Sequence, residues 1–330
     1  MGRVLVVGAT HGNERNGAWL LEQWRRRPEA LERHGLAVDL VVGNPAAAAE
    51  GRRYLDRDLN RSFEPSLLAD PLRQEREVLR ARELLRRHGA EGEKPALVVI
   101  DLHSTTSAMG NSMVVYGRRP ADLALAAAVQ LRLGLPIYLH EGDPAQTGYL
   151  VERWPGGLVV EVGPVPQGVL HPQICRQTSL AVATTLELLA LARRGALPQP
   201  RTLVVHRHLC SLDLPRHGDG SPSALIHPLR QGRDWQPLRP GEPLLQHAAG
   251  RTLPYEPPAG LENVMVWPVF INEAAYGEKG IALSLTERQV WSVEPAWAAA
   301  LEGLAAGLQP QTRVACSRVQ GRSVVLPSAQ

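Results

Sequence analysis

The stretch RVLVVGATHGNERNG (residues 3–17) joins a short apolar run to a loop in which His11 and Glu14 stand three residues apart. A nearly continuous run of Val and Leu that ends in Gly is typical of a strand covered on both faces of a sheet. In an open α/β sheet, ligands bind beyond the carboxyl ends of the strands. The stretch therefore predicts a buried first strand whose end presents His11 and Glu14 to a binding site.

The same pattern recurs through the first ~200 residues, where short apolar runs alternate with helical patterns that begin at Pro and end at Gly. This alternation predicts an α/β domain built on a mostly parallel sheet. Further strands are expected at residues 38–44, 96–103, 111–117 and 158–163. Helices are expected from Asp70-Pro71 to Gly89, over 120–134 and over 171–195.

The composition and the hydrophobic pattern change after the segment GALPQPR (195–201), where Pro and Gly become frequent and the apolar runs become short. We expect strands at 202–208, 264–272, 281–286 and 312–319, with one helix at 294–308. The chain is therefore predicted to divide into a catalytic domain (1–198) and a smaller β-rich domain (199–330).

Composition limits the classes of partner. The chain has 330 residues, is 44% hydrophobic and 21% charged, and carries a net charge of only +3. Such a chain is typical of a protein without a nucleic-acid or membrane partner. The first apolar run is too short for a signal peptide, and three scattered cysteines form no disulfide framework. We expect a cytoplasmic protein with a small-molecule ligand, and the pattern leaves open whether it is a monomer or a homo-oligomer.

A third candidate ligand, His103, ends another predicted strand. Two imidazoles and one carboxylate that leave a fourth position for water are a frequent catalytic zinc set. A lone His-x-x-Glu pair is more often two solvated loop residues. The residues alone therefore leave both interpretations open.

Six motifs in order along the chain resemble those of a known family. They are GATHGNERNG (8–17), RRYLDRDLNRSF (52–63), DLHSTTSAMGN (101–111), VEVGPVPQGVL (160–170), HPLRQGRDWQPLRPGEP (227–243) and PVFINEAAYGEKG (268–280). Together they are similar to the aspartoacylase and aminoacylase-3 family, which groups with the succinylglutamate desuccinylases. The resemblance implies a carboxypeptidase-A-like mixed sheet with flanking helices, a smaller β-rich C-terminal domain that contributes to the substrate pocket, and one Zn²⁺ per subunit.

The resemblance implies that His11, Glu14 and His103 are the zinc ligands and that Glu161 is the catalytic glutamate. A carboxylate among apolar valines has a raised pKa, which suits a group that takes a proton from water and passes it to a leaving amine. From the residues alone, a salt-bridged structural role for Glu161 is the stronger alternative.

Substrate contacts are implied in the same way. Arg53 is similar to the arginine that polarises the scissile carbonyl, and it is both a catalytic and a substrate-binding candidate. Asn60 and Arg61 resemble the pair that binds the substrate carboxylate, for which a planar guanidinium is well shaped. Tyr276 resembles the tyrosine that the second domain adds to the pocket.

Three acidic residues are expected to support the site rather than react. Asp58 is expected to orient Arg61 or a metal ligand. Asp101 is expected to orient His103, because residues i and i+2 project to the same side of a strand. Glu273 is expected to hold the interface between the domains.

The remaining histidines receive no role from the pattern. His206 and His208 alternate like one face of a strand, but no carboxylate lies near them in sequence, so structural or surface positions are expected. His140, His171 and His227 are expected in loops.

The predicted reaction is removal of an acyl group, most simply acetyl, from an N-acyl amino acid. The resemblance favours an aspartoacylase, which releases L-aspartate from N-acyl-L-aspartate. The alternatives are a deacylase of N-acyl aromatic amino acids similar to aminoacylase-3, a desuccinylase, and a catalytically silent binding protein on the same fold. Aspartate-directed members carry an Arg before the catalytic glutamate, where this chain has Tyr149 or Val151, and a Lys at the position of Gly280. We therefore expect weak activity on N-acetyl-aspartate unless Arg153 or Lys279 pairs with its side-chain carboxylate.

Overall fold

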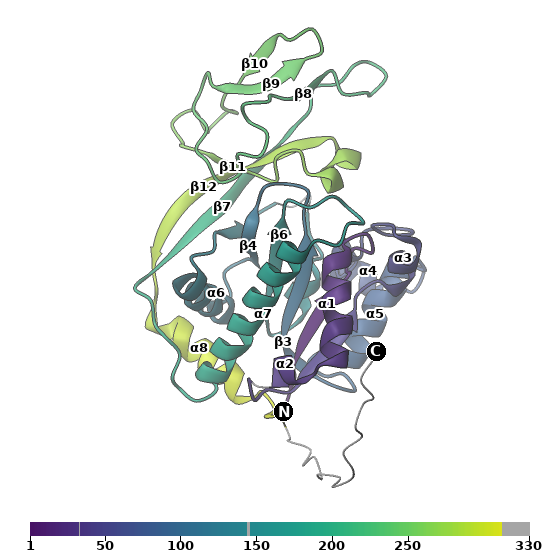
Figure 1. The fold of residues 1–330 in the computed structure, drawn as a ribbon, viewed down its shortest axis with the longest axis vertical. Helices are drawn as coiled ribbons and strands as arrows, with labels where there is room; N and C mark the ends of the chain where they lie inside the picture. The colour runs from purple at the N-terminus through teal and green to yellow at the C-terminus, as the bar shows by residue number, and fades with distance from the viewer. Residues whose placement is uncertain (33, 144–145, 312–330) are drawn as a thin grey trace, which may run out of the picture.

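A nine-stranded mixed sheet forms the centre of the molecule in the computed structural model, which describes residues 1–32, 34–143 and 146–311 (Figure 1). The strand order is β11-β12-β7-β5-β4-β6-β3-β1-β2. β4 is antiparallel to β6, and β12 is antiparallel to both β7 and β11, whereas the other neighbours are parallel. The strands of this sheet are β1 (Arg3–Gly8), β2 (Val38–Val42), β3 (Ala96–Ser104), β4 (Gly110–Tyr116), β5 (Ile137–His140), β6 (Gly156–Gly163), β7 (Thr202–Asp213), β11 (Trp267–Val269) and β12 (Ile281–Ser292).

Helices cover both faces of the sheet. One face packs against four helices, α1 (Arg15–Arg26), α6 (Pro120–Leu133), α7 (Pro172–Ala192) and α8 (Pro295–Ala306). The opposite face packs against α5 (Arg76–His88). Shorter helical segments occur in the connections: α2 (Glu29–Glu32), α3 (Pro45–Glu50), η1 (Leu59–Arg61), α4 (Pro65–Ala69), η2 (Leu150–Arg153) and η3 (Ala274–Lys279).

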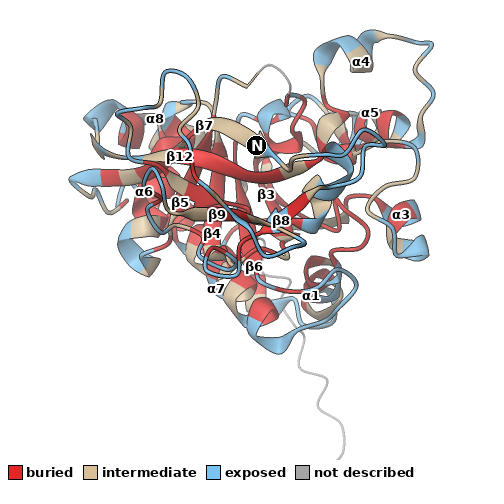
Figure 2. Cartoon of the chain, turned by 90° about the horizontal axis from the view of Figure 1, so that it is seen from above, coloured by how far each residue is buried: buried red, intermediate tan, exposed pale blue. Residues whose placement is uncertain are grey.

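The first strand shows why its sequence is apolar throughout. Val4 and Val6 belong to the core under α1, α6, α7 and α8, whereas Leu5 and Val7 belong to the core under α5. Alternate side chains of a strand point to opposite faces, so a strand between two cores needs apolar residues at every position. Figure 2 shows the buried residues concentrated in the sheet and on the inner faces of the helices.

The C-terminal part is joined to the main sheet by two long strands. β7 pairs with β5 and β12 pairs with β7, and both continue toward a separate sheet of β8 (Ala224–Ile226), β9 (Pro243–His247) and β10 (Thr252–Pro254) (Figure 1). A third core lies in this region. The division at 198/199 stays a prediction, and the strand expected at 312–319 lies outside the described residues.

The helix expected from Asp70-Pro71 begins later, at Arg76, so that prediction is wrong at its start. The Asp70 side chain accepts a hydrogen bond from the Leu72 N–H at 2.9 Å, which closes a turn instead of capping a helix. The Arg82 guanidinium holds this turn by donating to four backbone carbonyls, those of Leu67, Leu68, Asp70 and Arg73.

The strand β5 is absent from the predicted set, and the expectation that His140 lies in a loop is wrong. His140 is the last residue of β5, which lies between β4 and β7. Four apolar or aromatic residues are too few to give a clear period, so this strand forms through its pairing with its neighbours.

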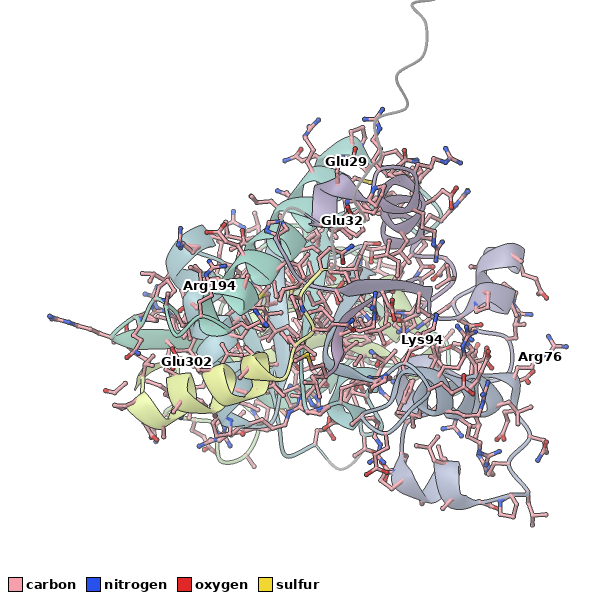
Figure 3. All side chains as sticks on the ribbon, turned by 90° about the horizontal axis from the view of Figure 1, so that it is seen from below. Glu29, Glu32, Arg76, Lys94, Arg194 and Glu302 are labelled. Atoms are coloured by element: carbon pink, nitrogen blue, oxygen red, sulfur yellow. The ribbon has the colours of Figure 1, made fainter. Side chains whose placement is uncertain are left out.

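The surface carries charges of both signs. Figure 3 shows the molecule from below and labels acidic and basic side chains that occur together on that side, including Glu302 and Arg194. Among the described residues, no helix has both the length and the apolar character that a bilayer span requires.

Candidate metal centre and active site

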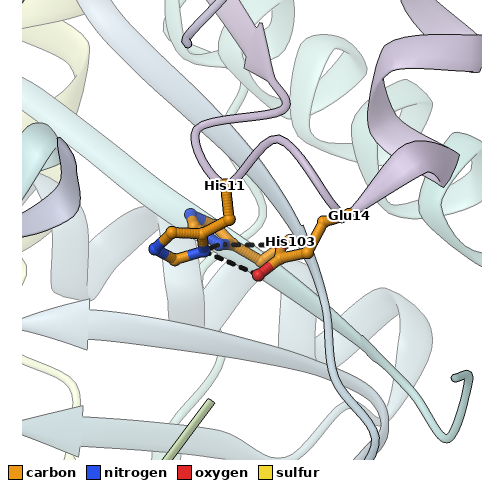
Figure 4. A group of neighbouring side chains, drawn as sticks. All are labelled: His11, Glu14 and His103. Atoms are coloured by element: carbon orange, nitrogen blue, oxygen red, sulfur yellow. Dashed lines mark hydrogen bonds and ion pairs between the residues drawn. The ribbon is translucent and has the colours of Figure 1, made fainter. Parts of the chain in front are cut away.

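Three donor atoms meet where β1 and β3 end. His11 and Glu14 come from the loop after β1, and His103 comes from the adjacent strand β3. The Nδ1 of His11 lies 2.6 Å from a carboxylate oxygen of Glu14 and 3.1 Å from the Nδ1 of His103 (Figure 4). The second Glu14 oxygen lies 3.1 Å from the His103 Nδ1. All three side chains are buried, so the predicted ligands form one compact group.

The hydrogen bonds around this group indicate that it suits a cation. The Nε2 of His11 lies 3.0 Å from an Asp58 oxygen, and the Nε2 of His103 lies 2.7 Å from an Asp101 oxygen. A carboxylate accepts hydrogen bonds, so a neutral imidazole that donates from Nε2 to its aspartate presents the lone pair of Nδ1 to the centre. Two lone pairs and a carboxylate that face one another repel unless a metal ion lies between them. The donor set therefore fits a metal ion.

Asp101 contacts His103 as expected, and its other oxygen accepts a hydrogen bond from the Thr10 hydroxyl at 2.6 Å. Asp58 is hydrogen-bonded to both His11 and Arg53. Of the two roles expected for it, orienting Arg61 or orienting a metal ligand, its contact with His11 fits the second. Each imidazole in the centre is thus oriented by its own buried or nearly buried carboxylate.

Backbone geometry sets the direction of the loop that follows β1 and carries His11 and Glu14. Ala9 has a φ of 53°, in the left-handed region that is uncommon for residues with a side chain, and this turn directs Thr10 toward Asp101 and His11 toward His103. Gly12 packs against the helix α3 so closely that a Cβ atom there would lie 2.2 Å from the carbonyl carbon of Ala47. Only glycine fits at that position.

The loop that carries Arg53 and Asp58 is held by a buried carboxylate, Glu77 of α5. Glu77 accepts backbone hydrogen bonds from three consecutive residues, Leu55, Asp56 and Arg57. Arg53 then reaches Asp58 at 3.0 Å and Glu14 at 3.4 Å. The sequence pattern does not single out Glu77, because its partners are backbone groups some 20 residues away in the chain.

Glu161 lies beside the centre on β6, where it is the register partner of His103. Its side chain is buried. Burial raises the pKa of the Glu161 carboxyl well above its ordinary value of 4.5, and the negative charges of Glu14 and Glu273 act in the same direction against the opposing effect of His103. A carboxyl with a raised pKa can both accept and return a proton near neutral pH.

Asn60 and Arg61 lie in η1, opposite the loop before β6. The Asn60 side-chain oxygen accepts a hydrogen bond from the Leu150 N–H at 2.9 Å. The Arg61 guanidinium lies over the Tyr149 ring, 4.1 Å from its centroid, and donates to Gln146 at 3.1 Å. Both side chains are therefore held in place before any substrate arrives.

Tyr276 enters the site from η3. Its segment is fastened by Glu273, which accepts hydrogen bonds from the backbone N–H groups of Thr106 and Ser107 at 2.8 and 3.2 Å. Glu273 thus links the C-terminal part of the chain to the loop after β3, in agreement with the interface role expected for it.

One cavity brings together all eight predicted site residues, which are His11, Glu14, Arg53, Asn60, Arg61, His103, Glu161 and Tyr276. The cavity also has aromatic and imidazole walls that the sequence pattern does not assign, made by Tyr116, Tyr138, His140, Tyr149 and Phe270. Tyr116 and His140 are the last residues of β4 and β5. Because β4 and β5 run antiparallel to β6, their carboxyl ends point away from the end of β3 that carries His103, and the strand-end rule does not identify these walls.

The catalytic-domain model of the succinylglutamate desuccinylases and aspartoacylases matches residues 1–189, and the barrel-sandwich hybrid domain model of the same family matches residues 201–288. The chain therefore belongs to the succinylglutamate desuccinylase/aspartoacylase family of deacylases. It is an enzyme of the aspartoacylase and aminoacylase group within it, as the resemblance predicted.

Individual relatives cover nearly the whole chain. A protein of Parasynechococcus marenigrum (strain WH8102), named probable aspartoacylase, is 56% identical over 301 residues, which are 91% of this chain and 98% of that protein. A probable aspartoacylase of Prochlorococcus marinus (strain MIT 9313) is also 56% identical and covers 92% and 98%. The crystal structure of murine aminoacylase 3 is 36% identical, with a TM-score of 0.80 and coverage of 88% and 97%.

Proposed function

We propose that this protein is a zinc-dependent deacylase that hydrolyses the amide bond of an N-acyl amino acid, acetyl being the simplest acyl group. The observation that supports it most is the convergence of two imidazole Nδ1 atoms and one carboxylate beside a buried glutamate in a single cavity. A silent binding protein would not need a proton-transfer group with a raised pKa next to a metal centre.

His11, Glu14 and His103 would hold the zinc ion. Zinc supplies Lewis acidity, which polarises the substrate carbonyl and makes a water molecule more nucleophilic at neutral pH. Glu161 takes a proton from the attacking water and returns it to the leaving nitrogen, so water and amide become a carboxylic acid and a free amine. Arg53 provides fixed positive charge for the oxyanion that forms on the carbonyl oxygen.

Asn60, Arg61 and Tyr276 bind the amino-acid part of the substrate. Arg61 offers two parallel N–H donors to the α-carboxylate, and its stacking on Tyr149 keeps the guanidinium plane fixed. Because Asn60 and Arg61 already have protein partners, little side-chain entropy is lost when the substrate binds.

The first candidate substrate is N-acyl-L-aspartate, which would give a carboxylate and L-aspartate. The names of the relatives support it. Its side-chain carboxylate requires a cation, because an unpaired charge in a closed site is costly. Arg153 is exposed on η2 and does not line the cavity, whereas Lys279 lines an adjacent one beside Asp143 and Gln146. Binding of the side-chain carboxylate of N-acyl-L-aspartate would therefore depend on Lys279.

A second candidate substrate is an N-acyl aromatic amino acid, as expected for an aminoacylase-3-like enzyme. Five Tyr and Phe rings line the cavity, those of Tyr116, Tyr138, Tyr149, Phe270 and Tyr276. Tyr116 and Tyr149 stack on each other with centroids 3.8 Å apart, and Tyr138 meets Phe270 edge to face. An aromatic substrate side chain packs favourably against such walls.

The composition supports a small-molecule substrate, no nucleic-acid or membrane partner and a cytoplasmic location, and we propose these as part of the same function.

Amine release from N-acetyl-aspartate, N-acetyl-tyrosine and N-succinyl-glutamate, measured alongside zinc content, tests the proposal. Hydrolysis of an N-acetyl amino acid by zinc-containing protein supports it. Preference for aspartate favours the first candidate, and preference for tyrosine favours the second. Zinc-loaded protein that hydrolyses none of these substrates contradicts it.

A further inference from the structure

A second group of potential ligands lies at the edge of the candidate active site. His140 ends β5, Asp143 follows it by three residues, and His208 lies on the neighbouring strand β7. One ligand atom from each residue lies within 4.8 Å of the others, and both histidines are buried. No carboxylate lies near His208 in sequence, and Asp143 approaches it from a distant part of the chain.

The arrangement repeats that of the first centre. There, a His-x-x-Glu sequence follows β1 and the second histidine comes from the adjacent strand β3. Here, a His-x-x-Asp sequence begins at the last residue of β5, and the second histidine comes from the adjacent strand β7. Two neighbouring parallel strands therefore bring together two imidazoles and a carboxylate at two places in one sheet.

The spacing suits metal ligands better than a direct hydrogen bond. The Nε2 of His208 lies 3.7 Å from an Asp143 oxygen, which is beyond hydrogen-bond range. Two ligands of one tetrahedral ion, each bound at about 2.0–2.1 Å, lie about 3.4 Å apart. The His140 and His208 rings are stacked, with centroids 5.1 Å apart and planes 27° apart, so they stand side by side on one face of the sheet.

Both imidazoles are held in a form that can bind a metal. The Tyr138 hydroxyl lies 2.9 Å from the Nδ1 of His208, and the Tyr149 hydroxyl lies 3.3 Å from the Nε2 of His140. A phenol oxygen can accept a hydrogen bond from an imidazole N–H, which leaves the other ring nitrogen, Nε2 of His208 or Nδ1 of His140, with a lone pair for a metal ion. Burial lowers the pKa of His140 to about 3, and burial also lowers the pKa of His208, so both are neutral at physiological pH.

We propose that His140, Asp143 and His208 form a second metal site, distinct from the His11–Glu14–His103 centre, for Zn²⁺ or a similar ion that prefers nitrogen ligands. Asp143 and His208 line a cavity of about 440 Å³, which provides a route for the ion. Asp143 accepts a hydrogen bond from Gln146, which in turn accepts one from Arg61. An ion bound to Asp143 would therefore change the hydrogen bonds that hold the Arg61 guanidinium in place.

The test is the zinc stoichiometry of metal-stripped protein, titrated with Zn²⁺ against a chromophoric chelator. The wild type is expected to bind two equivalents, and His208→Gln and Asp143→Asn are each expected to bind one. His103→Ala is expected to lose the other equivalent and keep this one. Asp213→Asn is the matched control, because Asp213 lines the same cavity without belonging to the ligand group, and it should bind two.

One equivalent in the wild type overturns the proposal, as do two equivalents in both His208→Gln and Asp143→Asn. Loss of one equivalent in Asp213→Asn also overturns it, because cavity charge rather than ligation would then explain the binding. If His208→Gln fails to fold by circular dichroism, Asp143→Asn decides the test, since Asp143 is only half-buried and lies outside the helices and strands. Failure of the proposed deacylase function would leave these stoichiometries unchanged.

Discussion

Replacing Asp101 by Asn should weaken metal binding by reversing one hydrogen bond. In the protein, one Asp101 oxygen accepts from the Thr10 hydroxyl and the other from the Nε2 of His103. The Asn oxygen can keep the contact with Thr10, which places the NH₂ group against His103. His103 then has to present a lone pair at Nε2 and carry its proton on Nδ1, the atom that faces His11 and Glu14.

The size of the effect follows from the burial of this pair. Asp101 is fully buried and His103 is nearly so, so water cannot replace the lost contact. Loss of the residue that orients a metal-binding histidine costs about 10- to 100-fold in metal affinity, which is about 1.4–2.7 kcal/mol. We expect the Zn²⁺ dissociation constant of the first centre to rise by that factor.

The assay is Zn²⁺ competition with a chelator, measured in an Asp143→Asn background so that the second group does not contribute. Thr10→Val is the matched control, because it removes the other hydrogen bond to Asp101 and leaves the contact with His103. It should change the affinity much less. Equal affinity in Asp101→Asn and in the parent would refute the inferred tautomer of His103.

Three further predictions concern catalysis. Glu161→Gln keeps the shape of the side chain but cannot transfer a proton, so kcat should fall on the order of 10²-fold or more while zinc stays bound. A near-normal kcat would show that Glu161 has only a structural role. Glu161 accepts a proton only as a carboxylate, so kcat/KM should fall as the pH drops through its pKa, and because burial raises that pKa the fall should occur above pH 4.5; an acidic limb at or below that pH contradicts the burial argument. Lys279→Met should lower kcat/KM for N-acetyl-aspartate but not for N-acetyl-tyrosine, and equal losses on both substrates would show that Lys279 does not pair with the aspartate side chain.

The sequence pattern predicts the parts of the fold that local residues determine. Apolar runs identify β1, β3, β4 and β6, because a strand buried on both faces cannot contain many polar residues. The pattern does not predict β5, because four residues are too few to show a period and their pairing with β4 and β7 determines their conformation. The start of α5 is misplaced because the contacts of Arg82 with a distant turn favour an irregular segment there.

The candidate site divides in the same way. His11 and Glu14 are visible as a short motif, His103 is visible as the end of a predicted strand, and the role of Glu161 comes with the family resemblance. Their alignment on adjacent strands follows from sheet register. Asp143 beside His208 could not be predicted, since 65 residues of sequence separate them and only the pairing of β5 with β7 brings them together. The role of Glu77 could not be predicted for the same reason, because it accepts hydrogen bonds from backbone groups of another segment.

The most direct test of the central claim is amine release from N-acetyl amino acids by one preparation before metal removal, after it, and after addition of Zn²⁺. Elemental analysis should accompany each step. We predict that hydrolysis disappears with the zinc and returns when zinc is restored, and that His103→Ala is inactive in all three states. Full turnover by wild-type protein shown to be free of metal would contradict the account.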